Sequence, residues 1–200
     1  MRNHLVVLAR QPRRGRVKSR LAADIGPGPA LAVYRRLLSR TLRRLARDSR
    51  WTVVLAVTPA QQARRPGRWQ RGLPAIAQVG GDIGLRMAAA MAAMPAGKVV
   101  LVGSDIPGIG RGHVAAAFRA LDDHDAVFGP AEDGGFWLVG LAPSLRAAPL
   151  FEGVRWSSAH ALADAVAALP PGTRVARTAL LPDIDDGDDL ARWRARRKPV

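Results

Sequence analysis

The chain has 200 residues, 48% of them hydrophobic and 24% charged, which is ordinary for a folded globular protein. It contains no cysteine, so disulfides, thiolate metal sites and cysteine nucleophiles are excluded. The formal net charge is +15, and nearly all of the positive charge comes from arginine.

Length and hydropathy set the first expectations. A chain of this size suits one domain, which we predict over residues 1–200. The first apolar run, residues 5–9, is too short for the core of a signal peptide, and no apolar stretch is long enough to span a bilayer. We therefore expect a cytoplasmic protein without a membrane span.

The predicted elements alternate between short apolar strands and amphipathic helices. Strands are expected at residues 5–9, 52–57, 75–79, 98–102, 126–129, 136–140 and 175–181. Helices are expected at 18–23, from 29 to 45, from 84 to about 94, at 113–121, at 157–169 and after 187, while residues 61–72 indicate no element. This order predicts a three-layer α/β/α domain with a mostly parallel sheet. The connection between strands 126–129 and 136–140 is too short for a crossover helix, so these two are either antiparallel neighbours or separated by a bend.

Residues 99–108 organise the predicted site. An apolar, valine-rich run of the kind found in a buried parallel strand ends abruptly in Gly103-Ser104-Asp105. Asp105 therefore follows the carboxyl end of a strand, where ligands bind in open α/β sheets. Taken alone, this carboxylate is equally consistent with a helix cap and with a cation or metal ligand.

Three further loops follow predicted strands and carry charge or glycine. The loop after residue 9 holds Lys18 and Arg20, residues 130–135 hold Glu132 and Asp133, and five of the sixteen acidic residues lie in 183–189. Loops that follow parallel strands gather at one edge of the sheet, so these carboxylates and cations are expected to face one cleft. Such a cleft suits a pyrophosphate held with Mg²⁺ or Mn²⁺.

Each of these features also has a structural interpretation. Isolated surface cations and a tight Gly134-Gly135 turn need no ligand, and Asp188 and Asp189 suit the first turn of the last helix. The high positive charge admits a distant alternative, a basic nucleic-acid-binding module. The acidic loops of this chain would repel a phosphate backbone, and its arginines are spread along the whole sequence. Nucleic acid is therefore disfavoured as a partner.

Several motifs together carry a resemblance that covers nearly the whole chain. They are Arg10-Gln11-Pro12 through Ala22, Gly103 through Gly108, Gly129 through Leu141, Val154-Arg155-Trp156-Ser157 and Asp183-Ile184-Asp185. They resemble the signatures of a bacterial family of small GT-A-fold glycosyltransferases, some linked to arsenosugar biosynthesis. The chain is also similar to nucleotidyltransferases of the same fold, such as the molybdenum-cofactor and phospholactate guanylyltransferases.

The resemblance implies a nucleotide-diphospho-sugar transferase fold, Rossmann-like, and a role for each matched residue. Asp105 and Asp185 would hold the metal, Asp105, Glu132 and Asp133 would be catalytic, and a third set would bind the nucleotide. That set is Arg10, Gly15, Lys18, Arg20, Gly81, Asp82, Gly134 and Gly135.

The sequence departs from the family pattern at a few positions. Arg10 stands where the family often has Lys, Arg14 where it often has Pro, and Leu85 where a polar residue is usual. Gly-Ser-Asp replaces the Asp-x-Asp usual in glycosyltransferases of this fold and is closer to the nucleotidyltransferase pattern. The leading hypothesis is a metal-dependent enzyme that moves a sugar from a nucleotide sugar to a small acceptor. The alternative joins a nucleoside triphosphate to a small phosphorylated or acidic acceptor, and the sequence leaves this choice open.

Overall fold

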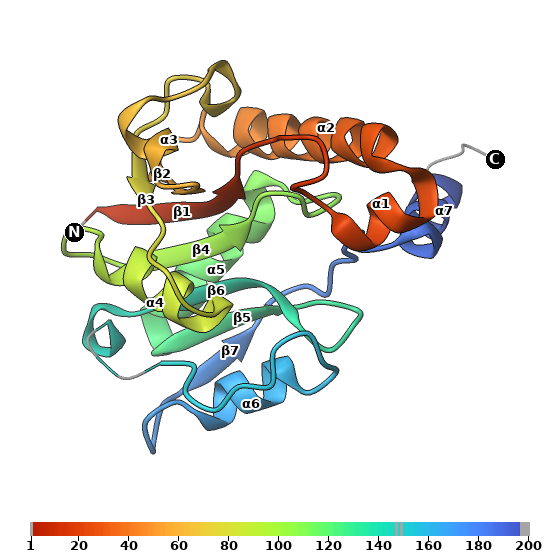
Figure 1. The fold of residues 1–200 in the computed structure, drawn as a ribbon. Helices are drawn as coiled ribbons and strands as arrows, with labels where there is room; N and C mark the ends of the chain where they lie inside the picture. Colours follow the sequence, from red (N-terminus) through yellow and green to blue (C-terminus); the bar gives the residue numbers. More distant parts are fainter. Residues whose placement is uncertain (1, 147, 149, 197–200) are drawn as a thin grey trace.

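The computed structural model describes residues 2–146, 148 and 150–196. Its centre is a seven-stranded sheet with the strand order β3-β2-β1-β4-β6-β5-β7 (Figure 1). The strands are β1 (Asn3–Arg10), β2 (Trp51–Thr58), β3 (Ala75–Ala77), β4 (Val99–Gly103), β5 (Ala126–Pro130), β6 (Phe136–Leu141) and β7 (Val175–Arg177).

Helices connect most of these strands. They are α1 (Ser19–Ile25), α2 (Pro27–Leu45), α3 (Gln61–Arg64), α4 (Ile83–Ala92), α5 (Arg111–Asp123), α6 (Ala161–Ala167) and α7 (Gly187–Ala195), with short 3₁₀ turns at Arg68–Gln70 and Pro143–Leu145. In the described part of the chain, no helix is both long and apolar enough to cross a membrane.

The sheet is parallel except around β6. This strand pairs antiparallel with both β4 and β5, whereas β1 pairs parallel with β2 and β4, and β5 pairs parallel with β7. Of the two alternatives for the strands at 126–129 and 136–140, the structure has the antiparallel neighbours. The arrangement also places β6 between β4 and β5, so the two strands that run in the same direction are not adjacent.

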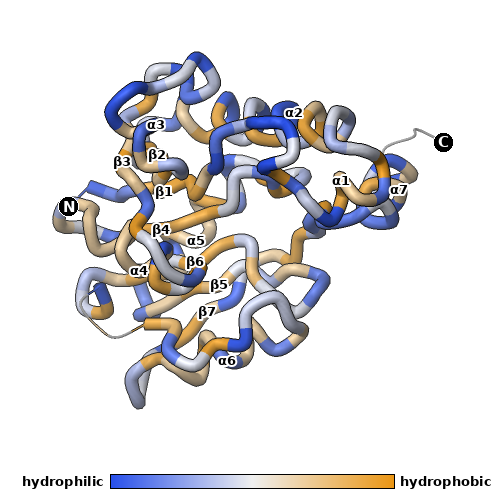
Figure 2. Tube along the Cα trace, in the orientation of Figure 1, coloured by the Kyte–Doolittle hydropathy of each residue, from blue (hydrophilic) through white to orange (hydrophobic). Residues whose placement is uncertain are grey.

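Helices cover both faces of the sheet and make the predicted three layers. On one face, Leu38 and Leu42 of α2 pack with Val114 and Phe118 of α5 against the strands. On the other face, α4 and α6 pack through a second buried cluster that includes Phe128. Figure 2 shows the hydrophobic residues concentrated along the strands and the hydrophilic ones in the loops and on outer helix faces. Burial of these apolar faces supplies most of the driving force for the fold.

A third, smaller cluster brings the end of the chain back to its beginning. Leu21 of α1, Leu37 of α2, Ile184 and Leu190 of α7 are buried against one another. The backbone N–H of Gly187 also donates to the Asp24 carboxylate at 2.8 Å. This docking holds the acidic segment that precedes α7 beside the loop that follows β1.

Several predicted elements are shorter than expected, two of them by at least four residues, and one segment gains structure. The helix expected at 157–169 spans only Ala161–Ala167, because Ser157 adopts a left-handed φ of 57° that starts a turn. The strand expected at 175–181 ends at Arg177, since the register of β5 shifts at Gly129/Pro130 and leaves only an isolated bridge between Ala131 and Leu181. The unassigned residues 61–72 contain α3 and a 3₁₀ turn.

Candidate active site at the carboxyl edge of the sheet

Two neighbouring pockets lie where the loops after β1 and β4, the β5–β6 turn and the segment before α7 come together. The first has a volume of about 300 Å³ and the second about 340 Å³. Arg20 and Asp185 line both pockets and so stand at the boundary between them. Both pockets therefore lie at the carboxyl edge of the sheet, which is the edge predicted from the charged loops that follow the strands.

Lys18 is the centre of the first pocket. Its Nζ lies 2.7 Å from Oδ2 of Asp105 and 3.1 Å from Oδ1 of Asp185, while Arg20 approaches the other oxygen of Asp185 at 3.6 Å. The Lys18 side chain is only 10% exposed. Two carboxylates separated by 80 residues of sequence therefore converge on one buried cation.

The backbone of Lys18 is arranged to make this contact. Lys18 precedes α1 with φ 47° and ψ 57°, a left-handed conformation that costs a non-glycine residue about 1 kcal/mol or more. The burial of the ammonium group would by itself lower its pKa, but the charges of Asp105 and Asp185 outweigh burial and raise the pKa of Lys18. Lys18 is therefore a firmly charged group inside the pocket.

A buried hydrogen-bond network holds the backbone next to Asp105 in place. The Tyr34 hydroxyl donates to the carbonyl of Arg10 at 2.9 Å, accepts the N–H of Arg10 at 3.0 Å and meets Oγ of Ser104 at 3.2 Å. Burial and the nearby charge of Asp105 raise the pKa of Tyr34 to about 12, so the phenol stays neutral. The network ties α2 to the ends of β1 and β4, which fixes the loop that carries Asp105.

Gln78 and Arg86 form the far wall of the first pocket. The Gln78 side-chain amide donates to the carbonyls of Ala9 at 3.2 Å and Ala56 at 2.6 Å, and its oxygen accepts from Nε of Arg86 at 2.9 Å and also from Nη2. Burial, and then the charge of Arg10, lower the pKa of Arg86. Arg10 and Arg86 therefore line the same pocket, and neither forms a salt bridge with a described residue, which suits a bound anion.

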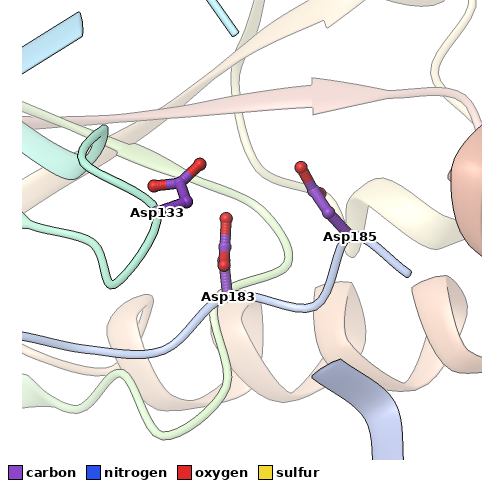
Figure 3. A group of neighbouring side chains, drawn as sticks. All are labelled: Asp133, Asp183 and Asp185. Carbon is purple, nitrogen blue, oxygen red and sulfur yellow. The ribbon is translucent and has the colours of Figure 1, made fainter. Parts of the chain in front are cut away.

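A second group of carboxylates includes Asp185 and extends from it into the second pocket. Carboxylate oxygens of Asp133, Asp183 and Asp185 all lie within 4.8 Å of one another. Figure 3 shows Asp183 between the other two, with the three carboxyl groups on the same side of the chain. Burial, followed by the charges of Asp133 and Asp185, raises the pKa of Asp183 to about 6. Such a set of oxygen donors is the kind that Mg²⁺ and Mn²⁺ prefer.

A capping box at the start of α7 positions Asp185. The Asp189 carboxylate accepts the backbone N–H of Asp185 at 2.8 Å and that of Asp186 at 3.2 Å, and Asp186 in turn accepts the N–H of Asp189 at 2.9 Å. Asp188 and Asp189 lie in the first turn of α7, as predicted, and Asp186 is the N-cap of this helix. Asp183 and Asp185 remain directed at the pockets.

The second pocket combines acidic and aromatic walls. Asp133, Asp183 and Asp185 line one side, Phe136, Trp137 and Trp156 line another, and Arg20 is its only basic residue in the described part of the chain. Phe136 packs against Phe151 and Trp156, with ring centroids 6.2 and 6.1 Å away. The Nε1 atom of Trp156 is buried without a hydrogen-bond partner among the described residues. This pocket offers an apolar ring surface beside carboxylates.

The β5–β6 turn that carries Asp133 is tightly constrained. The N–H of Gly135 donates to Oδ1 of Asp133 at 2.9 Å. Gly134 has a φ of 84°, and a Cβ at this position would overlap the backbone of Ala159. Its carbonyl accepts the N–H of Leu162 at 3.0 Å. In the structure Gly134 lets the turn pack against the segment before α6, and Gly135 orients Asp133.

The structure separates other predicted residues from the pockets. Glu132 lines neither pocket and instead accepts from Nη1 of Arg196 at 3.0 Å. Asp82 caps α4 by accepting the N–H of Leu85 at 2.8 Å, and Gly81, at φ 100°, packs under the Leu85 side chain. Gly15 lies at φ 69° in the loop after β1, with open space around it.

Among the predicted nucleotide-binding residues, Arg10, Lys18 and Arg20 line the first pocket. Arg10 is tied through its Nη1 to the carbonyl of Arg16 at 3.1 Å. Three residues that line the first pocket were not predicted from the sequence: Tyr34, Gln78 and Arg86. The spacing of Tyr34 indicated only a core residue of a helix. The polar residues at 78 and 86 that flank the Gly-Gly-Asp turn were the available signal.

With this geometry in place, the chain can be compared with known proteins. The family described as "Uncharacterized protein conserved in bacteria (DUF2064)" matches residues 41–158, which is more than half of the chain. The chain belongs to this family. No curated protein sequence matches it.

Solved structures agree with the fold. A Desulfovibrio desulfuricans G20 protein assigned to the nucleotide-diphospho-sugar transferases is 28% identical, with a TM-score of 0.82 over 99% of this chain and 89% of that one. The 4-diphosphocytidyl-2C-methyl-D-erythritol synthase of Anaerococcus prevotii DSM 20548 is 9% identical, with a TM-score of 0.66 over 98% and 95%. A Mycobacterium tuberculosis protein solved in complex with manganese is 18% identical, with a TM-score of 0.52 over 96% and 98%.

These comparisons confirm the predicted family likeness and fold class. They also agree with the prediction of a transferase that uses an activated nucleotide, since sugar transferases and nucleotidyltransferases share this fold.

Proposed function

We propose that this chain is a one-domain, cytoplasmic, divalent-metal-dependent transferase that moves a sugar from a nucleotide sugar to a small hydroxyl-bearing acceptor. The nucleotide would occupy the pocket around Lys18 and the acceptor the pocket beside Asp133. The observation that carries this proposal is the shared boundary of the two pockets, where Asp185 and Arg20 line both.

The residues present suit a Mg²⁺ or Mn²⁺ ion. Asp105 and Asp185 already converge on a single cation, the Lys18 ammonium, and Asp183 adds a carboxylate next to Asp185. A donor set of one to three carboxylates with open positions is typical of a metal that also binds substrate phosphates. Bound there, the metal would stabilise negative charge on the leaving phosphate.

The cations of the first pocket would hold the nucleotide. Lys18 and Arg20 would neutralise the diphosphate, with Arg10 and Arg86 at the opposite wall. Lys18 is already held by Asp105 and Asp185 before any ligand binds, so little rotamer entropy would be lost when a phosphate oxygen contacts it.

Asp133 is the residue best placed to act on the acceptor. It lines the second pocket, and Gly135 holds one of its oxygens and leaves the other available. In the proposed reaction the acceptor oxygen bonds to the anomeric carbon and its proton passes to Asp133. The bond from that carbon to the phosphate oxygen breaks, and the nucleoside diphosphate leaves with the electron pair. Glu132, turned toward Arg196, is assigned no role in this scheme.

The lining of the second pocket favours glycosyl transfer over nucleotidyl transfer to an acid. A phosphorylated or acidic acceptor would need cations, but Arg20 is the single basic residue among the described lining residues and already approaches Asp185. Three carboxylates and three aromatic rings suit a neutral, polyhydroxylated acceptor, which can stack a ring face and donate hydroxyl hydrogen bonds.

One observation favours the nucleotidyl alternative. Gly103 stands where glycosyltransferases of this fold usually carry the first Asp of Asp-x-Asp, and Ser104, at the middle position, has its hydroxyl buried against Tyr34. The loop after β4 therefore offers one carboxylate, Asp105, rather than two. Nucleoside triphosphates therefore need to be tested beside nucleotide sugars.

A thermal-shift screen of nucleotide sugars and nucleoside triphosphates, with and without Mn²⁺, tests the proposal. We expect the largest Mn²⁺-dependent stabilisation from a nucleotide sugar, and its loss in Asp105→Asn. Asp122→Asn is the matched control, because Asp122 is an exposed acid on α5 paired with Lys98. An unchanged Mn²⁺-dependent shift in Asp105→Asn would refute the metal assignment, and a preference for a triphosphate would favour nucleotidyl transfer.

A further inference from the structure

A hollow lined by arginines lies between the C-terminal half of α2 and the start of α5. Its volume is about 570 Å³, within the range of small-ligand sites. Its lining residues are Arg40, Arg43, Arg44, Arg47, Gly110 and Arg111. The spacing of Arg40, Arg43 and Arg44 places them on one face of α2. Arg47 follows just after the end of this helix, and Arg111 joins from an element that is distant in sequence. None of these residues lines either pocket of the candidate active site.

Two hydrogen bonds hold the walls of this hollow together. Nη1 of Arg44 donates to the carbonyl of Ile109 at 3.1 Å, and Nε of Arg111 donates to the carbonyl of Arg44 at 2.9 Å. Each bond uses one N–H of a guanidinium that carries five. The remaining donors of both side chains are left for another acceptor, and the two elements are fixed relative to each other.

Four of the arginines that line the hollow form no salt bridge with any described residue. In the part of the chain that the structure describes, no carboxylate oxygen lies within 4.0 Å of the guanidinium groups of Arg43, Arg44, Arg47 or Arg111. The neighbouring carboxylate, Asp48, is paired with Arg50, whose Nη2 lies 2.6 Å from Oδ2 of Asp48. Gathered like charges repel each other, so an anion between them would be stabilised.

We propose that this hollow is a second anion site that binds a compact polyphosphate, separately from the nucleotide pocket. Arginine forks match phosphate oxygens with paired hydrogen bonds, and guanidiniums gathered around one hollow can neutralise several charges at one point. A nucleic-acid backbone instead spreads single charges along a line and needs an extended basic track. The local arrangement therefore favours a small polyphosphate over RNA or DNA.

Calorimetric titration of tripolyphosphate into the full chain, with EDTA present to remove divalent metal, tests this site. The double variant Arg43→Gln/Arg47→Gln is expected to weaken binding by about tenfold or more, because two charge-assisted contacts are lost. The control Arg64→Gln/Arg65→Gln removes the same charge from exposed positions at the end of α3, outside the hollow, and should bind nearly as well as the wild type. Glutamine retains a high helix propensity at the substituted positions.

Two further variants separate this site from the others. Arg111→Gln, which changes the opposite wall, should also weaken binding, whereas Lys18→Met, which changes the nucleotide pocket, should leave this binding event intact. The proposal is overturned if only Lys18→Met weakens tripolyphosphate binding, or if both double variants behave alike. It is equally overturned if a single-stranded RNA oligonucleotide, at equal phosphate concentration, displaces tripolyphosphate through the same arginines. The midpoint of thermal unfolding, measured for each variant, separates lost binding from lost folding.

Discussion

At the scale of single residues, the site depends on backbone conformations that few side chains adopt. Lys18 reaches Asp105 and Asp185 from a left-handed conformation, and Gly134 lets the β5–β6 turn touch Ala159. In both cases the local geometry directs a functional side chain, Lys18 itself or the adjacent Asp133, into a pocket. Strained or glycine-dependent positions of this kind concentrate at functional sites.

Replacing Gly134 tests how much this turn contributes. Gly134→Ala is expected to lower the free energy of unfolding by more than about 3 kcal/mol, because the strain of a positive φ adds to overlap with the Ala159 backbone. Gly153→Ala is the matched control: its φ is 71°, but the space around it is open, so about 1 kcal/mol is expected. Urea unfolding measures both, and equal losses would show that the contact with Ala159 is unimportant.

At the scale of elements, one ion pair holds the segment before α6 against that helix. The Asp164 carboxylate accepts from Nε and Nη2 of Arg155, both at 2.8 Å, and from the Arg155 backbone N–H at 3.1 Å. The adjacent Trp156 lines the second pocket. The motif Val154-Arg155-Trp156-Ser157 thus positions an aromatic wall rather than opening a longer helix.

This pair predicts a pH dependence of stability. Hydrogen bonds from Arg155 lower the pKa of Asp164 to about 2. Because the folded-state pKa lies below the unfolded value, the stabilisation is present above about pH 4 and is lost as the pH falls toward about 2. The difference in unfolding free energy between wild type and Asp164→Asn should therefore shrink across this window. Asp123→Asn, an exposed position on α5, serves as the control, and a constant difference for Asp164→Asn would contradict the prediction.

At the scale of the whole molecule, basic residues outnumber acidic ones, yet several carboxylates gather in the candidate site. The chain has 31 basic and 16 acidic residues, yet Asp133, Asp183 and Asp185 meet within 4.8 Å. The hydrophilic outer faces of Figure 2 include the α2 arginines. The excess of positive charge would attract anions toward the molecule.

The excess charge should also make stability depend on salt. Repulsion within a chain of net charge +15 is long-ranged at about 10 mM salt and strongly screened at about 150 mM, so added NaCl should raise the midpoint of thermal unfolding. Arg64→Gln/Arg65→Gln, with two fewer positive charges, should respond less. A midpoint that falls with added NaCl would mean that favourable ion pairs outweigh the net repulsion.

The sequence by itself determined the fold class and the edge of the sheet that carries the site. Apolar runs such as residues 99–102 are typical of strands covered on both faces, and their alternation with amphipathic stretches predicts helices on both sides. Loops that follow parallel strands share one edge, so Lys18, Asp105 and Asp185 could be expected together. The fold class can be inferred in this way because the local pattern of apolar and polar residues indicates which face of an element is buried.

Only the tertiary structure decided which side chains meet. Local sequence patterns do not predict three features of this structure. These are the position of β6 between β4 and β5, the contact of Lys18 with a carboxylate 167 residues away and the pairing of Glu132 with Arg196. The same holds for the arginines of α2, whose spacing indicates a solvated face until Arg111 closes the hollow. Long-range contacts depend on how whole elements pack, and periodicity within one element carries no information about its partner.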